Sequence, residues 1–314
     1  MPHSTRKHRP SPSSKRRFLP SSNGDGWTHV LTTHHKPSTH GSSTARKPLQ
    51  PADIPPGLTL EKLHAEYARH LQIFQASECW TQLRAMLAEA VLPSPSSSSD
   101  EKKKRTDDCV CVGLGSPSDP ISRRITLFQL AALESILSLL DTSPSHQPLK
   151  TYAQDPVFNA LDTAFLTSLP RPLDMTIVAD PAAVALIKPS TLVYAPHCER
   201  SFLLPALHGR NPAMLLGNDM DALLTGPLSS SLAPPETETA RTFLRHRTSR
   251  RFPVFEPLEA AFNDTRVYWT EDGDEDENDA SISTSTPTST STDADADAET
   301  KIQTRAEHAT STSS

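Results

Sequence analysis

Val110-Cys111-Val112-Gly113-Leu114-Gly115 is a short apolar run that ends in glycine, and an amphipathic helical pattern over residues 125–140 follows it. The same alternation continues along the chain. Further apolar runs lie at 151–153, 175–178, 191–194 and 213–216, and helical patterns separate them at 156–168, 182–186 and 201–207. Apolar strands that alternate with helices indicate right-handed βαβ units. The sequence therefore predicts an α/β fold: a Rossmann-like, doubly wound, mainly parallel sheet with flanking helices.

An N-terminal helical extension precedes the first strand. Apolar residues recur at helical spacing over residues 58–92, with Thr59 as the expected N-cap and a break near Ser77. We expect these helices to pack on the sheet, because their apolar stripe would otherwise face water. Residues 93–107 are rich in Ser, Pro and charged residues, and we interpret them as a flexible linker.

The α/β domain is expected to span residues 108–270. Within it, residues 226–250 are rich in Pro, Ser and Thr and carry basic residues, so we expect a flexible insertion that leaves the sheet. The strand-like run Val267-Tyr268-Trp269 then closes the domain.

Two tails of opposite charge flank this domain. Residues 1–50 contain nine Lys/Arg and one Asp, whereas residues 271–314 contain twelve Asp/Glu and two Lys/Arg. With 29 Pro and only 35% hydrophobic residues, the composition is that of a folded core averaged with segments too polar to fold. We therefore expect disordered tails at 1–57 and 271–314 that bind protein partners. The region between them is mildly acidic, so composition gives no support for nucleic-acid binding by the core.

The cysteine pattern indicates a reducing compartment, since four cysteines without a CxxC motif do not suggest a disulfide scaffold. Cys109 and Cys111 are two apart on a strand and should point to the same buried face. No apolar run is long enough to span a membrane, and the N-terminus lacks a secretory signal. We expect a soluble cytoplasmic and/or nuclear protein. Basic clusters at 6–9, 15–17 and 102–105 resemble nuclear import signals, with solvated charge as the alternative.

Polar and glycine-rich motifs follow the expected strands. Because ligands bind at the carboxyl ends of parallel strands, these motifs should meet at one edge of the sheet. The candidate ligand-binding residues are Gly113, Gly115, Ser116, Gln129, Asp155, Pro156, His197, Cys198, Gly217 and Asn218. Their types and spacing identify no catalytic residue and no metal site.

The glycines and the acid after the second strand each have two interpretations. Gly113 and Gly115 either present backbone amides to a phosphate or ribose, or simply form a turn. A dinucleotide motif needs a third glycine where Ser118 stands. Asp155 either binds a ribose hydroxyl or caps the next helix, with Pro156 as the first residue of that helix.

The remaining candidates also have alternatives. Gln129 lies either on the exposed surface or in the crevice, and Asn218 either contacts a ligand or bonds loop backbone. His197 and Cys198 point to opposite sides of an extended chain, so they do not form a catalytic pair. Either residue is a possible haem ligand, and the alternative for His197 is a hydrogen bond to loop backbone.

Taken in order, five motifs resemble the "sensitivity to red light reduced" domain family. They are 110–116, 129–131, 155–158, 194–198 and 215–218, and Phe262-Asn263-Asp264-Thr265 is similar to the closing motif of that domain. The resemblance implies a regulatory protein with roles in circadian or light signalling, or in tetrapyrrole (haem) metabolism. It carries over signature positions but no catalytic residue.

Regulation without turnover is the function we favour from the sequence, with a ligand or partner at the strand-end crevice. The alternative is an enzyme that uses a nucleoside cofactor, S-adenosylmethionine or NAD(P), in a Rossmann-like crevice. Haem sensing through His197 or Cys198 is a third hypothesis.

Overall fold

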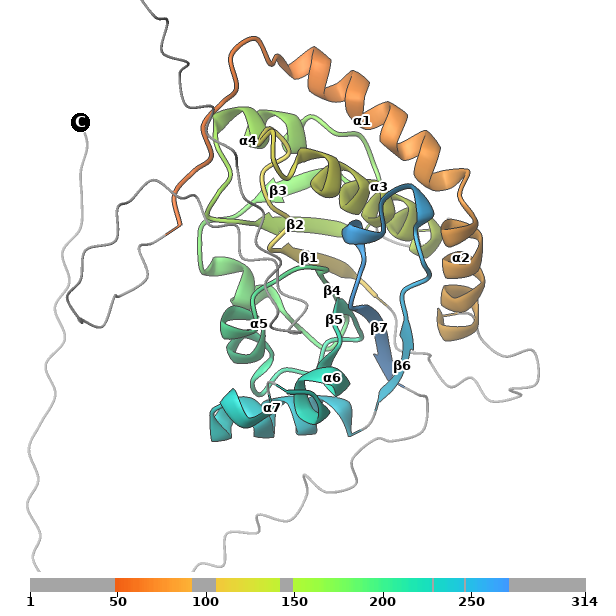
Figure 1. The fold of residues 1–314 in the computed structure, drawn as a ribbon, viewed down its shortest axis with the longest axis vertical. Coiled ribbons are helices and arrows are strands. Elements are labelled where there is room, and N and C mark those ends of the chain that lie inside the picture. The colour runs from red at the N-terminus through yellow and green to blue at the C-terminus, as the bar shows by residue number, and fades with distance from the viewer. Residues whose placement is uncertain (1–48, 92–105, 142–148, 228, 246, 271–314) are drawn as a thin grey trace, which may run out of the picture. The chain divides into compact units, whose positions relative to one another are not determined.

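The computed structural model describes residues 49–91, 106–141, 149–227, 229–245 and 247–270. A seven-stranded sheet forms the centre of this part of the chain, in the order β3-β2-β1-β4-β5-β7-β6 (Figure 1). Its strands are β1 (Asp108–Val112), β2 (Lys150–Gln154), β3 (Met175–Ile177), β4 (Thr191–Ala195), β5 (Met214–Asn218), β6 (Arg247–Arg251) and β7 (Thr265–Thr270). The first five are parallel, and β7 runs antiparallel to both β5 and β6. The predicted α/β, mainly parallel fold is confirmed.

Helices cover both faces of the sheet (Figure 1). On one face lie α1 (Leu60–Gln75), α2 (Glu78–Val91), α3 (Arg123–Leu140), α4 (Ala160–Thr167) and the short 3-10 helix η3 (Glu256–Ala261). On the other lie η1 (Ala182–Leu186), α5 (Arg200–Leu207), α6 (Met220–Thr225) and α7 (Pro234–Leu244), with the 3-10 turn η2 (Ser229–Ser231) between α6 and α7.

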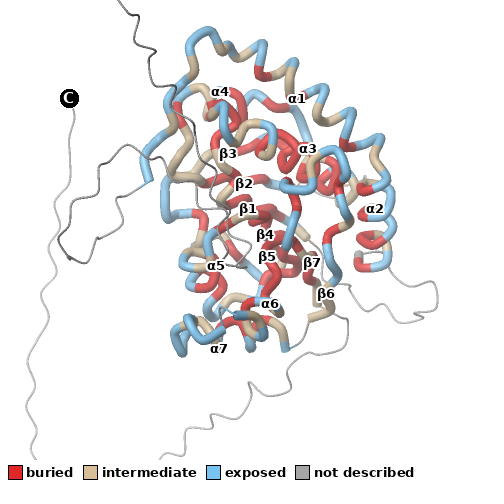
Figure 2. The backbone as a smooth tube through the Cα atoms, in the orientation of Figure 1, coloured by how far each residue is buried: buried red, intermediate tan, exposed pale blue. Residues whose placement is uncertain are grey.

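The strands divide the core into two clusters because their side chains alternate between the two faces. Cys109 and Cys111 are fully buried in the cluster beneath α3, as predicted, whereas Val110 and Val112 belong to the cluster beneath α5. Figure 2 shows buried positions concentrated along the central strands. Strands buried on both faces are typical of a parallel sheet covered by helices on both sides.

The N-terminal helices pack on the sheet as expected. Leu63, Tyr67 and Phe74 of α1 are buried in the same cluster as the β1 cysteines. The hydroxyl of Thr59 accepts a hydrogen bond from the Lys62 amide at 3.3 Å, which confirms the predicted N-cap. The expected break is also present, since Ser77 lies between α1 and α2 and its hydroxyl accepts from the Trp80 amide.

The segment 226–250 differs from the expected excursion. It contains α7 and most of β6, and β6 pairs with β7 from Arg247 to Arg251. Ala240 and Phe243 of α7 are buried against the sheet. The prediction that this segment leaves the sheet was wrong. The strand was not recognised from the sequence because an arginine-rich edge strand lacks the apolar pattern of a central strand.

Most of the tails and the 93–107 linker lie outside the described residues, as do the three basic clusters. In the portion of the chain that is described, every helix is too short or too polar to cross a bilayer.

Candidate functional site

The chain order of the strands reverses direction between β1 and β4, which creates a switch point of the kind where open α/β sheets bind ligands. The loops after these two strands touch. Gly113 has φ +68°, and a Cβ built there would lie 3.1 Å from both Cα and Cβ of Cys198. Only glycine combines this backbone conformation with so close an approach.

A second contact joins the loops after β1 and β2. The amide of Gly115, which has φ +80°, donates to Oδ2 of Asp155 at 2.8 Å, and the Val157 amide donates to Oδ1 at 3.0 Å. Burial raises the pKa of Asp155, while these two backbone hydrogen bonds oppose the rise. The carboxylate therefore ties two strand-end loops together.

The expectation that Asp155 caps the next helix is wrong. Helix α4 begins at Ala160, and the N-cap is Asn159, whose side-chain oxygen accepts from the amides of Leu161 and Asp162. Pro156 is half-buried in the preceding turn rather than at the first helical position. Sequence reasoning placed the start of α4 too early because Asp-Pro is itself a favoured helix start.

A buried carboxylate that sequence reasoning missed holds the loop after β1. Asp162 is fully buried and accepts hydrogen bonds from the Ser116 hydroxyl at 2.6 Å and the Ser118 amide at 2.8 Å. It also accepts from the Asn159 amide at 3.0 Å, and Nδ2 of Asn159 bonds the Ser118 hydroxyl at 2.7 Å. The signal available was the capping box formed by Asn159 and Asp162, three residues apart.

Gln129 reaches the same edge of the sheet from α3. It is buried, so the surface interpretation of this residue is wrong. Its Nε2 lies 3.0 Å from the carbonyl oxygen of Ala261 and 3.0 Å from Nδ1 of His197. The backbone carbonyl oxygen of Gln129 accepts from the Tyr194 hydroxyl at 2.7 Å. A carbonyl oxygen only accepts, so the atom facing Ala261 is the amide nitrogen.

The same amide sets the tautomer of His197. One hydrogen of Nε2 goes to Ala261, and the other goes to Nδ1 of His197, which must then be the unprotonated ring nitrogen. The ring proton therefore sits on Nε2 of His197. The expected hydrogen bond from His197 to loop backbone is not the one found at Nδ1, which instead bonds the side chain of Gln129.

The Nε2–H of His197 is buried and forms no hydrogen bond of good geometry among the described residues, although the Asn263 side chain lies close to the ring. Burial lowers the pKa of His197, while a weak hydrogen bond with the Asn263 side chain and the charge of Asp264 oppose that shift. An unpaired buried donor costs about 1–3 kcal/mol. A ligand atom that accepts this hydrogen bond would remove the cost, which makes His197 the central group of the candidate site.

The cysteine beside it is not poised as a nucleophile. Cys198 is buried against Gly113, and burial raises the pKa of its thiol to about 12. Cys79 behaves in the same way, with a pKa also raised to about 12 by burial. Within the described ranges, no three His, Cys, Asp or Glu side chains are grouped as metal ligands.

Gly217 and Asn218 lie one strand further along the same edge. Gly217 pairs with Ala195 and Arg266 inside the sheet, and a Cβ there would lie 3.3 Å from the Ala195 carbonyl oxygen. Asn218 is buried at the end of β5, and its Oδ1 has no partner in the described structure. The contacts at this edge of the sheet thus join Gly113 to Cys198, Gly115 to Asp155 and Gln129 to His197. Gly217 and Asn218 lie beside them.

The chain was compared with known protein families, curated proteins and solved structures. The family model of the SRR1 domain matches residues 71–269, which begins within α1 rather than at the expected residue 108. No curated protein matches the chain significantly. A crystal structure of a protein from Corynebacterium glutamicum is similar, with 15% identity and a TM-score of 0.31, and the match covers 66% of this chain and 96% of that one.

Proposed function

We propose a regulatory function for this chain, which belongs to the SRR1 domain family by the match over residues 71–269. In this proposal the protein binds a small ligand in the switch-point crevice. The resemblance to the sensitivity to red light reduced family makes circadian or light signalling, or tetrapyrrole metabolism, the proposed setting. The observation that carries the proposal is the buried Nε2–H of His197, which forms no hydrogen bond of good geometry in the described structure.

Binding is favoured over catalysis because the reactive groups of the crevice are engaged or suppressed. Asp155 and Asp162 accept backbone amides, and the Cys198 thiol has its pKa raised to about 12. A thiol with that pKa is overwhelmingly protonated at neutral pH and therefore a poor nucleophile. His197 remains the group that can exchange a hydrogen bond with a ligand.

The expected ligand presents a hydrogen-bond acceptor to His197, such as a carbonyl, carboxylate or ring nitrogen. Haem iron fits this site poorly. Ligation through Nε2 of His197 would require its proton to move to Nδ1, but Nδ1 accepts from the Gln129 amide, which Ala261 holds in place. Cys198 would have to lose a proton in a buried position against Gly113.

A nucleoside-dependent enzyme is the second candidate, and the strand order β3-β2-β1-β4-β5 favours it, because dinucleotide-binding domains share that order. The glycine turn after β1 is also in the expected place. However, the Gly115 amide that would face a phosphate donates to Asp155 instead, and Ser118 replaces the third glycine. S-adenosylmethionine or NAD(P) would have to displace that contact.

Thermal-shift measurements on the full chain test both candidates with S-adenosylmethionine, NAD⁺, NADP⁺, ATP and haem. A probe at about 100 times its dissociation constant should stabilise the protein by roughly 2.7 kcal/mol. We expect one probe to raise the melting temperature of wild type and of the control His208→Ala, but not of His197→Ala. His208 is a suitable control because it bonds Thr239 on the α7 side of the sheet.

The other outcomes are equally informative. A nucleoside shift that is lost in Asp155→Ala and kept in His197→Ala would replace the regulatory proposal with the enzyme. If none of the five probes shifts the wild type, or if His197→Ala responds like wild type, ligand binding through His197 is refuted.

Protein partners of the tails and a cytoplasmic and/or nuclear location are further parts of the proposal. They rest on the charge pattern of residues 1–50 and 271–314. Removal of either tail should abolish partner capture while the ligand-induced thermal shift persists. Loss of that shift on removal of the tails would show that they belong to the ligand site.

A further inference from the structure

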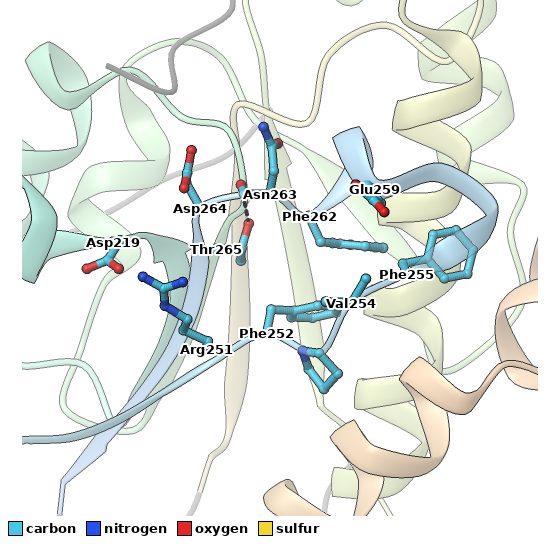
Figure 3. A pocket seen from close by; sticks show the side chains of 11 residues that line it. Asp219, Arg251, Phe252, Val254, Phe255, Glu259, Phe262, Asn263, Asp264 and Thr265 are labelled. Atoms are coloured by element: carbon cyan, nitrogen blue, oxygen red, sulfur yellow. Dashed lines mark hydrogen bonds between the residues drawn. The ribbon is translucent and has the colours of Figure 1, made fainter. Parts of the chain in front are cut away.

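A pocket of about 190 Å³ lies beside β7, where the chain passes from β6 through η3 (Figure 3). Its lining includes the buried side chains of Phe252, Phe255 and Phe262. Exposed charged side chains on its lining are Arg251, Glu259 and Asp264. The pocket therefore combines an aromatic floor with a charged rim.

The aromatic floor is well defined. The rings of Phe252 and Phe262 stack with centroids 4.3 Å apart and an interplanar angle of 18°, and Phe255 meets Phe262 edge-on at 5.8 Å. Backbone bonds hold this floor, since the Phe252 amide donates to Thr265 at 2.9 Å and the Phe262 amide to Glu259 at 3.1 Å. Aromatic faces carry negative potential and attract cations.

The charges around the pocket do not cancel. Asp219 pairs with Arg266 at 2.8 Å, and Asp221 lies 3.9 Å from the same guanidinium. Arg251 is turned toward Asp219, and Asp264 lies on the same side (Figure 3), so this side of the pocket holds two positive and three negative charges.

Glu259 lies on the other side of the aromatic rings (Figure 3). Glu259 and Asp264 form no ion pair within the described part of the chain. Their carboxylates are exposed at the rim of the aromatic floor. An unbalanced negative charge therefore lies next to an aromatic surface, a combination that recognises organic cations.

We infer that this pocket binds a guanidinium or alkylammonium group. At about 190 Å³ it is smaller than the roughly 300–1,000 Å³ of pockets for drug-sized ligands, which suits one side-chain-sized cation rather than a nucleotide. The group is either part of a free small amine or the basic side chain of a partner protein. This inference does not depend on a ligand at His197.

Calorimetric titration of the full chain at constant ionic strength tests the inference. The probes are agmatine, a free guanidinium compound, and a blocked Gly-Arg-Gly peptide. We expect saturable binding of at least one probe. Glu259→Gln and Asp264→Asn should each weaken it about two- to fivefold, as for exposed ion pairs. Arg251→Gln should strengthen it, because it removes a positive charge from the rim.

The matched control is Glu256→Gln, an exposed acid on the same segment that does not line the pocket. It should bind like wild type. Phe262→Leu tests the floor and should weaken binding by about two- to fivefold, from the lost cation–π contact. Its melting temperature is measured alongside, and Glu259→Gln gives the same answer without altering the buried floor.

The inference is overturned if neither probe binds saturably, if Glu259→Gln and Asp264→Asn bind like wild type, or if Arg251→Gln weakens binding. Tighter binding of the peptide identifies a partner side chain as the source, and tighter binding of agmatine identifies a free amine. Failure here is distinct from failure of the crevice proposal, because Glu259→Gln changes a rim carboxylate that does not act on His197, whereas His197→Ala removes the donor of the crevice.

Discussion

Nε2 of Gln129 lies 3.0 Å from Nδ1 of His197, and the same nitrogen bonds the carbonyl oxygen of Ala261 at 3.0 Å. One side chain on α3 therefore joins the loop after β4 to the segment that leads into β7. Because both hydrogens of the amide are used, the histidine keeps its proton on Nε2, which forms no hydrogen bond of good geometry in the described structure.

Replacement of Gln129 should allow the His197 ring to adopt either tautomer. Gln129→Leu leaves two buried acceptors without a donor, so we expect it to lower the free energy of unfolding by about 2–4 kcal/mol. Nitrogen NMR of the imidazole should then show a mixture of tautomers in place of the Nε2–H form. Gln82→Leu, at an exposed position, should change stability by less than about 0.5 kcal/mol. A single unchanged tautomer in Gln129→Leu would contradict this prediction.

The stability contributed by His197 should depend on pH in a defined direction. Burial lowers the pKa of this residue in the folded state below its ordinary value of 6.5, so the unfolded chain binds the proton more readily. The contribution is complete above about pH 6.5 and is lost as the pH falls through the folded pKa. On acidification, the free energy of unfolding measured in urea should therefore fall more for wild type than for His197→Gln. Parallel curves for the two proteins would refute it.

Gly113→Ala should be more damaging than an alanine at a glycine with open surroundings. The new Cβ would lie 3.1 Å from the Cys198 backbone, in addition to the unfavourable φ of +68°. Gly57 has φ +75° with nothing within 4 Å of a built Cβ, so Gly57→Ala reports the conformational cost alone, about 1–2 kcal/mol. Chemical denaturation should show a larger loss for Gly113→Ala, and equal losses would argue against the close contact.

Asp162 should be needed to hold the loop after β1. Asp162→Ala removes the acceptor of the Ser116 hydroxyl and of the Ser118 and Asn159 amides, and we expect a loss of roughly 2–4 kcal/mol. Asp221→Ala, at a half-exposed position, should cost at most about 1 kcal/mol. Hydrogen exchange at the Ser118 amide should accelerate in Asp162→Ala alone. An unchanged exchange rate would show that the network does not protect this loop.

The cysteines should react slowly in the native state. Burial raises the pKa of both Cys79 and Cys198 to about 12, so little thiolate is present at neutral pH. Alkylation followed by mass spectrometry should label neither residue in the native protein and both in urea. Rapid native labelling of Cys198 would mean that the loop after β4 opens and would revive a nucleophilic role.

The sequence was sufficient for the parallel sheet, because buried central strands read as apolar runs between helical patterns. It also predicted the convergence of the glycine turn with His197 and Cys198, since parallel strands share one carboxyl edge. It failed at β6, where Arg247 and Arg251 belong to an edge strand with little apolar content.

Contacts between residues distant in the chain were the other limit. The burial of Gln129 depends on Ala261, which lies 132 positions later, and the Asp162 network depends on Ser116, 46 positions earlier. Local patterns report amphipathicity and capping but not these pairings. The pocket beside β7 likewise arises from the meeting of Asp219 with residues 251–265 and leaves no local signature.

Nitrogen–proton NMR of the His197 imidazole in the full chain tests the ligand-binding role most directly. The spectrum is recorded with and without each of the five probes. We predict that one probe moves the Nε2–H resonance and slows its exchange with water, because the probe accepts that hydrogen bond. An Nε2–H signal unchanged by every probe, including any that raises the melting temperature, would contradict the proposed role of His197.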